Sequence, residues 1–589
     1  MDMNWDLTIM YDAYNKKYAS DVKKLEEAIN EQIKCAEELS LDDQITSISK
    51  YLKCEEKINI IASELLIYSY LRLSTNVNDM EAAKEVGKIQ VMMEKVVPAT
   101  VLFKKYLKNV DLADCVSSSK FLKEYEYKLN KTQKETKFLL TDKEEIMASK
   151  LTMVASASWE ELQSKLTANL SIKVKGIKEK MPLSAVRNLA YDSDKIIRKN
   201  AYLAELKSYQ LIEDSVAMAL NNIKREVNIM TELRGYKNAL EETLFYSNMG
   251  KKTLDAMIEA IKEELPKFRE YYKLKAKALG YKKGLPFYEI FAPMGKMVKT
   301  YSYDEAKGLV LDVYGSFSDK LKAMAEEAFA NKWIDVLPRN GKEGGAFCAD
   351  VSNHKVSRVL MNFTGSLGDV QTLAHELGHA YHNYIIFDNA PLNQNYPMQL
   401  AETASILCQT LMAKKMVSDL DDNWERLTVL EQSLQEDTQC VVDILSRFIF
   451  ENKVLETPIS EPLSSDDLCS MMLDAQRQSY GDGLDDKYLH PYMWLCKGHY
   501  YSTSSFYNWP YAFGLLYGKG LYKQYLKDKE KFDIKYDEKH RNTALMDVEE
   551  VAKTMGIDVT DKAFWKESLS AIEEDITEFS NILKELKLV

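Results

Sequence analysis

The most reactive pattern in this sequence combines two histidines and one glutamate, in the segment His375-Glu376-Leu377-Gly378-His379. Residues four apart lie on the same face of an α-helix, so the imidazoles of His375 and His379 can bind one metal ion. Glu376 lies beside His375 and can take a proton from a water molecule that the metal holds. The alternative is a surface helix that happens to carry two histidines. The spacing favours a zinc site that hydrolyses amide bonds.

Glu402 is the best candidate for a third ligand. A catalytic zinc ion usually takes three protein ligands and leaves one position for water. Glu402 follows His379 by 23 residues, enough for one helix to end and a second to return antiparallel, with Pro397 in its first turn. A helical glutamate taken alone is usually solvated. With the motif beside it, we expect one Zn²⁺ held by His375, His379 and Glu402, although cobalt or manganese could replace zinc.

The other histidines have different expected roles. His382 lies nearly one turn past His379, but three ligands from one short helix would crowd the metal. We therefore expect His382 outside the ligand set, either behind the ligands as a supporting residue or on the pocket wall, where it can contact substrate. His354 and His490 are expected to be structural or surface residues. His540 lies in a stretch rich in Lys, Asp and Glu and is expected to be solvated.

A second dense region runs from residue 499 to residue 514 and is rich in aromatic side chains. Peptide hydrolysis builds negative charge on the carbonyl oxygen, which a tyrosine hydroxyl or an imidazolium can stabilise. Aromatic residues at helical spacing are more often packing residues, and we expect packing for most of this run. Residue types alone do not choose between the two roles.

Local signals before and within the motif predict the elements that position it. Ser366, with Asp369 three residues later, predicts a capped helix start just before the motif. Gly378 costs about 1 kcal/mol of helix propensity, which indicates close approach of another backbone or of substrate. Residues 345–349 and 358–363 are short strand-like runs. We therefore expect one small β-sheet next to the motif helix.

The sequence of the first half of the chain predicts a structural scaffold of helices. Residues 1–280 contain no histidine, few Gly and Pro, and apolar residues at helical spacing, for example at 21–39 and 254–265. We expect a mainly α protein with a helical N-terminal lobe over residues 1–190 and a catalytic domain over residues 191–589. The N-terminal lobe would form one wall of a cleft.

Composition excludes several classes of partner. The net charge of −12 argues against nucleic acid and anionic membranes, which reward clustered Lys and Arg. No apolar run approaches the roughly 18 residues that span a bilayer. The N-terminus lacks the basic start and apolar core of a signal peptide, so we expect a cytoplasmic protein. The eight cysteines form no C-x-x-C pair and are expected to be free thiols, with Cys348 a possible regulatory thiol.

Several segments stand in a fixed order around the motif and are more specific together than the motif alone. They read FYEIFAP at 287–293, GKEGGAF at 341–347, NFTG at 362–365, DVQTLAHELGHAYH at 369–382, AETAS at 401–405, and FY followed by YAFG within 506–514. In this order the sequence resembles the thimet-oligopeptidase-like metallopeptidases, most closely their bacterial branch, oligoendopeptidase F. The resemblance covers roughly residues 190–585.

The resemblance implies a two-lobed helical zinc metallopeptidase with a deep central cleft that admits short peptides. It implies His375, His379 and Glu402 as ligands and Glu376 as the general base, in agreement with the spacing. It also implies that His499, Tyr507 and Tyr511 face the substrate carbonyl. The sequence departs from the family pattern at Gln409, where many relatives carry an acid, and at Trp509, where many carry a tyrosine.

The expected function is therefore zinc-dependent hydrolysis of internal bonds in short peptides. The strand of Met361, Asn362 and Phe363 is expected to pair with the substrate backbone, with Gly345 and Ala346 also in contact with substrate. The oligomeric state is left open.

Two rival functions remain at this point. A metallo-carboxypeptidase or dipeptidase would need a cation for the terminal carboxylate, which Arg339, Lys342 or Lys355 could supply. A peptide-binding protein with a structural metal is disfavoured, because structural zinc sites usually have four ligands rich in Cys and none lies at a ligand-like spacing here.

Overall fold

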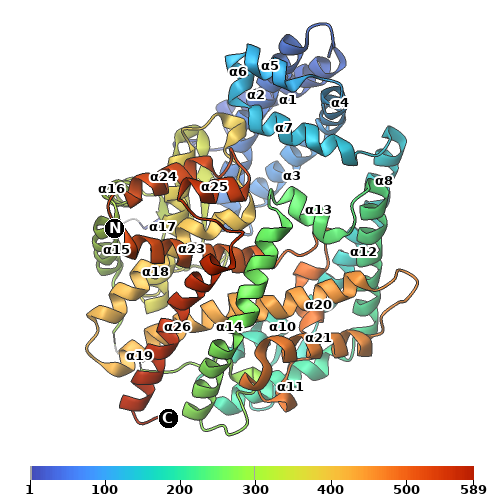
Figure 1. Ribbon diagram of the computed structural model, residues 1–589. Helices are drawn as coiled ribbons and strands as arrows, with labels where there is room; N and C mark the ends of the chain where they lie inside the picture. Colours follow the sequence, from blue (N-terminus) through green and yellow to red (C-terminus); the bar gives the residue numbers. More distant parts are fainter. Residues whose placement is uncertain (1–2, 297–298) are drawn as a thin grey trace.

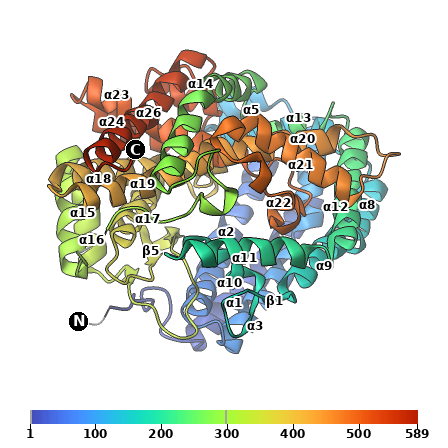
Figure 2. The ribbon, with the colours of Figure 1, turned by 90° about the horizontal axis from the view of Figure 1, so that it is seen from below.

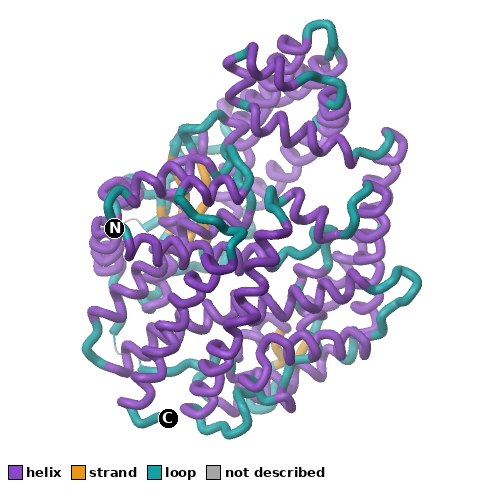
Figure 3. Tube along the Cα trace, in the orientation of Figure 1, coloured by secondary structure: helices purple, strands orange, loops and turns teal. Residues whose placement is uncertain are grey.

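Helices make up most of the chain, and two small sheets are set among them (Figure 3). The structure is a computed structural model that describes residues 3–296 and 299–589. Residues 1 and 2, part of the N-terminus considered above, lie outside the described residues. Among the described helices, none is long and apolar enough to cross a membrane.

The first half of the chain is built from helices, as expected, and these are shown from blue to green in Figure 1. Their bounds are α1 Lys16–Glu37, α2 Gln44–Thr75, α3 Met80–Glu94, α4 Val97–Leu107, α5 Leu112–Ser118, α6 Lys120–Glu124, α7 Glu126–Glu135, α8 Asp142–Val154, α9 Ser156–Ala168, α10 Leu183–Asn188, α11 Lys195–Tyr209, α12 Glu213–Arg234, α13 Ala239–Tyr246 and α14 Lys251–Ala278.

The second half continues the helical pattern around the three-stranded sheet. Its helices are α15 Tyr303–Phe317, α16 Asp319–Ala330, α17 Leu367–Ile386, α18 Met398–Asp419, α19 Asn423–Thr438, α20 Ile444–Glu456, α21 Ser465–Tyr480, α22 Met493–Cys496, α23 Trp509–Lys527, α24 Phe532–Asn542, α25 Val548–Thr554 and α26 Lys562–Glu585. A π-helical turn, η6 (Gln439–Asp443), joins α19 to α20.

Helix α14 runs further than its sequence suggests. The apolar spacing predicted a helix over 254–265, but α14 continues through Pro266 to Ala278. Proline normally interrupts the helical hydrogen bonds. Beyond it, however, Phe268, Tyr271 and Tyr272 are buried in the main core. Tertiary packing of these aromatic rings therefore outweighs the local cost of the proline.

The three-stranded sheet has the order β3-β5-β4 and lies against α17. Strand β3 (Ile334–Asp335) is parallel to β5 (Val356–Leu360), and β4 (Phe347–Val351) is antiparallel to it. The expected sheet next to the motif helix is thus present, since Asn383 of α17 donates to Ser357 of β5 at 3.2 Å. A second sheet, the hairpin of β1 (Ser171–Lys173) and β2 (Lys180–Pro182), was not predicted.

Buried apolar side chains form two principal cores. The larger core joins α1 and α2 to the sheet and to α14, α17, α18, α23 and α26. The smaller core joins residues 170–223 to residues 450–501, shown in teal and orange in Figure 2. A satellite cluster lies among α1, α2 and α4–α7. The domain boundary expected at residue 190 stays a prediction.

Candidate functional site

Helix α17 carries the motif, and its start has the predicted cap. Ser366 Oγ accepts from the backbone N–H of Asp369 at 3.1 Å, and the Asp369 carboxylate accepts from the N–H of Ser366 at 3.0 Å. This capping box satisfies two amide groups that the first turn leaves free. The helix then runs without interruption to Ile386, so His375 and His379 lie on one face.

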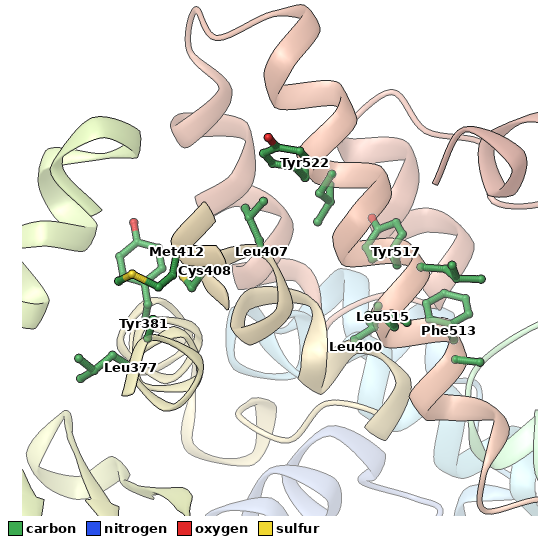
Figure 4. Close-up of a cluster of buried hydrophobic side chains, with 14 of the residues drawn as sticks. Leu377, Tyr381, Leu400, Leu407, Cys408, Met412, Phe513, Leu515, Tyr517 and Tyr522 are labelled. Atoms are coloured by element: carbon green, nitrogen blue, oxygen red, sulfur yellow. The ribbon is translucent and has the colours of Figure 1, made fainter. Parts of the chain in front are cut away.

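Helix α18 lies between α17 and α23, and glycines allow the close approach on both sides. A Cβ on Gly378 would lie 2.7 Å from the Cα of Ser405 and 2.9 Å from the carbonyl oxygen of Ala404. On the other side, a Cβ on Gly514 would lie 2.7 Å from the Cβ of Glu402. The prediction that Gly378 permits another backbone to pack closely is confirmed. Figure 4 shows the apolar side chains of α17, α18 and α23 that pack around these contacts.

This packing brings the three expected metal ligands together. Oε2 of Glu402 lies 3.3 Å from Nε2 of His375 and 3.4 Å from Nε2 of His379. One possible ligand atom from each residue lies within 4.8 Å of the others, and this is the only such cluster among the described residues. Ser405 Oγ donates to the same Glu402 oxygen at 2.9 Å and helps to fix its direction.

A chain of amide and carboxylate groups sets the proton position on His375. Gln409 Nε2 lies 2.7 Å from Glu436 Oε2, and the carboxylate can only accept, so the Gln409 amide nitrogen must face Glu436. Gln409 Oε1 then faces Nδ1 of His375 at 2.8 Å and accepts its proton. Nε2 therefore faces Glu402: it donates to the carboxylate when it is protonated, and it offers its lone pair when a metal ion takes the place of that proton. The donor set of two imidazoles and one carboxylate fits a catalytic zinc ion.

The charges around Glu402 favour its ionised form, which is the form that binds a metal ion. Burial by itself raises the pKa of Glu402, but hydrogen bonds and charge from His375 and His379 hold it well below its usual range. Burial by itself lowers the pKa of His375, because it disfavours the charged imidazolium. The hydrogen bond to Glu402 and the charges of Glu376 and Glu402 outweigh burial and raise the pKa to about 9. In the protein without metal, these three ligand groups thus attract one another and hold the site together.

Glu376 is a buried carboxyl group beside the ligands, with 6% of its surface exposed. Burial raises its pKa above the ordinary value, while the charges of His375 and His379 act in the opposite direction. A raised pKa suits a group that must first take and later return a proton near neutral pH.

The three expected carbonyl-facing residues also lie together. The ring of His499 lies 4.9 Å from that of Tyr507 and 6.4 Å from that of Tyr511 between centroids. His499 Nδ1 bonds to Asn508 Oδ1 at 2.9 Å, and Asn508 Oδ1 also accepts from Arg447 at 3.0 Å. The residue before Tyr507, Phe506, has a positive φ of 56°, a strained conformation that is enriched at functional sites.

Two cavities adjoin these groups. One of about 280 Å³ is lined by the ligands His375 and Glu402 together with Gln409, Glu436 and Tyr511. Another of about 390 Å³ is lined by Tyr507 and the residues before it. Tyr511 thus shares a cavity with the ligand cluster, while Tyr507 opens toward the neighbouring one.

Two of the histidine expectations are wrong. His382 has no exposed surface and bonds to Thr543 Oγ1 at 2.9 Å, so it does not reach the pocket wall. His540 is also fully buried rather than solvated, and its Nδ1 lies 2.8 Å from the carbonyl oxygen of Tyr536. The charged neighbours Glu538 and Arg541 are exposed, whereas Lys539 is buried together with His540, which faces α17.

The segment expected to pair with the substrate backbone, residues 361–363, is bonded on one of its sides, and its pairing with substrate stays a prediction. Because β5 is the central strand, the residues that follow it already bond on one side: Met361 N–H donates to Asp335 O and Phe363 N–H donates to Val336 O. Strand β4 is paired on one side only among the described strands. Asn362 supports the segment before β4, because its amide donates to Gly345 O at 2.8 Å.

The other residues considered in the sequence have structural partners. Arg339 and Lys342 both pair with Asp335, and Lys355 pairs with Asp388 at 2.9 Å, so none of the three cations proposed as a carboxylate clamp is free. All eight cysteines are free thiols. Burial raises the pKa of Cys348 well above its usual range, which argues against a reactive thiolate there.

The sequence reasoning missed the roles of Ser405, Gln409 and Glu436. Gln409 follows Glu402 by seven residues and so lies on the same face of α18. That spacing is a local signal that could have identified Gln409 as a partner of a ligand. Glu436 lies on α19, and no local pattern connects it to the motif.

Gly378→Ala is expected to lower the free energy of unfolding by about 1–3 kcal/mol, because the added methyl group must push α18 away from α17. The ligands on the two helices would separate, so zinc affinity should fall as well. Thermal unfolding and zinc titration against a chromophoric chelator measure both effects. Gly308 of α15 is exposed, with nothing within 4 Å of a Cβ, so Gly308→Ala should be neutral or stabilising. Equal behaviour of the two variants would contradict the packing argument.

Gln409→Ala is expected to weaken zinc binding about 10- to 100-fold, since His375 loses the partner that fixes its tautomer. The same chelator competition gives the affinity. Gln478→Ala, on the exposed face of α21, serves as the control and should bind zinc like the unchanged protein. Unchanged zinc affinity in Gln409→Ala would rule out this role.

Comparisons with known proteins agree on one family. The model of peptidase family M3 matches residues 188–571. The oligopeptidase PepF of Bacillus subtilis is 24% identical over 473 residues, which cover 79% of this chain and 70% of that one. The group B oligopeptidase PepB of Streptococcus agalactiae is 23% identical, with coverage of 98% and 97%. A solved structure from Chlamydophila abortus shares the fold with a TM-score of 0.85, at 21% identity and 98% coverage of both chains.

Proposed function

Since the chain belongs to peptidase family M3, we propose that it is a zinc-dependent endopeptidase that hydrolyses internal bonds of short peptides. The observation that carries this proposal is the convergence of His375, His379 and Glu402 next to the buried Glu376. Short peptides are the proposed substrates because the relatives PepF and PepB are named oligopeptidases.

His375, His379 and Glu402 would hold one Zn²⁺ in this proposal. When bound, the ion supplies a Lewis acid that polarises the substrate carbonyl and acidifies water. Glu376 takes the proton of the attacking water and then returns it to the leaving amine. Its burial supports this role, because the raised pKa brings acid and base forms within reach of the same pH.

Tyr507 and Tyr511 are proposed to donate hydrogen bonds to the carbonyl oxygen as it gains negative charge, and His499 joins them through Nε2 when its imidazole carries a second proton. The shared cavity of Tyr511 and the ligand cluster supports this role for Tyr511. Asn508 and Arg447 hold the ring of His499 from behind. Donors that are held in place before the reaction need little reorganisation during it.

The substrate backbone is proposed to run along the free edge of β4 and past the exposed Gly345 and the half-buried Ala346 before it. Backbone pairing gives affinity with little choice of sequence. Met361, Asn362 and Phe363 would support this edge from the central strand rather than pair with substrate themselves. In the same proposal, residues 1–190 form the helical lobe that faces the catalytic domain of residues 191–589.

Mass spectrometry of the products from a ten-residue peptide with both ends blocked tests the proposal. Internal cleavage that stops with a chelator and returns with zinc would support it. Cleavage only of a peptide with free ends would instead indicate an exopeptidase. No cleavage by the zinc-loaded protein would indicate a peptide-binding protein.

A further inference from the structure

A third cavity, of about 200 Å³, lies beside the smaller core, near the proposed carbonyl-facing residues. Its wall includes Arg187, Arg198 and Lys497 as cations and Gln439 of the π-helical turn. The next residue, Cys440, lines the cavity that contains the ligands. The two cavities therefore adjoin the same turn of η6. Lys497 directly follows α22, which Figure 2 shows beside α21, and it precedes His499 by two residues.

The arginines of this cavity already have carboxylate partners. Arg187 pairs with Glu205 at 2.6 Å and also contacts the thiol of Cys496. Arg198 pairs with Glu289 at 2.6 Å and gives its remaining donor group to the carbonyl oxygens of residues 192 and 193. These pairs have no net charge, so they hold the wall together without attracting an anion.

Arg447, behind the cavity, is committed in the same way. It pairs with Asp443 and donates to Asn508, the residue that bonds to His499. The second oxygen of Asp443 accepts from Tyr480 at 3.2 Å. Both oxygens of Asp443 therefore have other donors, although its charge is close to Lys497.

Lys497 differs from all of these cations. Within residues 3–296 and 299–589, its side chain forms no ion pair and no hydrogen bond. It is half-buried, and burial together with the charge of Arg447 lowers its pKa to about 8. At neutral pH most molecules therefore still carry the charge. A half-buried ammonium group without a partner is costly, and an anion in the cavity would remove that cost.

We propose that Lys497 binds a carboxylate of the bound peptide and so selects substrates that carry one beyond the cleaved bond. This inference rests on the proposed function. In an unmodified peptide only two sources supply a carboxylate, the C-terminus and the side chain of Asp or Glu. The site would take over the task that the sequence had assigned to Arg339, Lys342 or Lys355, all of which are held in ion pairs.

Four types of peptide built on one parent sequence, all with blocked N-termini, distinguish the sources. One has a free C-terminal carboxylate, one is amidated, and two amidated peptides carry Asp or Asn at one position, which is scanned along the chain. We expect kcat/KM of the zinc-loaded enzyme to be about 10- to 100-fold higher for peptides with the recognised carboxylate, mainly through KM. Lys497→Met should remove this preference and leave the amidated, uncharged peptide unaffected.

Two further variants separate binding from a structural role. Lys497→Arg keeps the charge and should recover part of the preference, while Lys487→Met removes an exposed lysine and should change nothing. Thermal unfolding and zinc content check that each variant folds. An equal loss of activity on all four peptides, or an unchanged preference in Lys497→Met, would overturn the proposal.

Failure of the proposed function would look different. If the unchanged protein cleaves none of the peptides, calorimetric binding of the free-acid and amidated peptides to the zinc-loaded protein still tests Lys497. A preference for the free acid or the Asp peptide that disappears in Lys497→Met would support the anchor without peptidase activity. Equal affinity for all four peptides would refute it.

Discussion

Glu376→Gln is expected to lower kcat about 10²- to 10⁴-fold, because the amide can neither take a proton from the attacking water nor return it to the leaving amine. The side chain keeps its shape, and the ligands His375, His379 and Glu402 are unchanged. Zinc content and the KM for a blocked peptide should therefore stay close to those of the unchanged protein. Single-turnover kinetics with a fluorogenic peptide, together with metal analysis, measure both quantities.

A matched control for this variant is Glu530→Gln, an exposed glutamate in the loop before α24. It makes the same chemical change far from the ligands and should leave turnover unaffected. If Glu376→Gln cleaved peptide at a rate comparable to the unchanged enzyme, the general base would have to be another group. If it lost zinc as well, the effect could not be assigned to proton transfer.

Glu402→Gln is expected to cost more zinc affinity than the loss of Gln409, that is, more than about 10- to 100-fold. It removes the only charged ligand, because the carboxylate on which Ser405 and both histidines converge becomes a neutral amide with one oxygen. Zinc that binds only the folded state stabilises it by about 2.7 kcal/mol at a concentration of 100 Kd, and the melting temperature rises accordingly. That zinc-dependent shift should disappear in the variant at zinc concentrations that saturate the unchanged protein.

The two variants are distinguished by added zinc. Activity of Glu402→Gln should rise again as zinc is increased, because its deficit lies in binding, whereas Glu376→Gln should stay inactive at every zinc concentration. Glu26→Gln, on the exposed face of α1, is the control for the amide substitution. Normal zinc affinity in Glu402→Gln would remove this residue from the ligand set.

The fold class could be predicted from sequence because its signals are local. Helical spacing of apolar residues, the capping box at Ser366 and the strand-like runs before the motif all depend on neighbours within a few residues. The errors have local causes too. The β1/β2 hairpin has strands of three residues each, too short for an alternating pattern to be recognised. The end of α14 was misplaced because Pro266 is a strong local signal that core packing overrides.

Burial of polar residues was the least predictable feature. His540 is surrounded in sequence by charged residues, yet it faces the interior between α24 and α17, with the amine of Lys539 beside it. His382 follows His379 by three residues on the motif helix, which places it about 60° away around the helix axis. At that angle its side chain faces the core and not the ligands. A rotation of 100° per residue decides between cleft and interior, and only the packing of neighbouring helices shows which side is which.

What the sequence determined by itself is the part of the site that one helix carries. The four-residue spacing places His375 and His379 on one face with Glu376 beside them, whatever surrounds the helix. Tertiary structure decided everything that must meet this helix from elsewhere. Glu402 reaches the histidines because Gly378 and Gly514 let α17 and α23 approach α18 closely, and Glu436 reaches His375 only through Gln409. Lys497 is set apart because it lines a cavity without an ion-pair or hydrogen-bond partner among the described residues, and only the fold shows this. Such contacts join residues far apart in the chain, and their distances depend on how whole helices pack rather than on any local pattern.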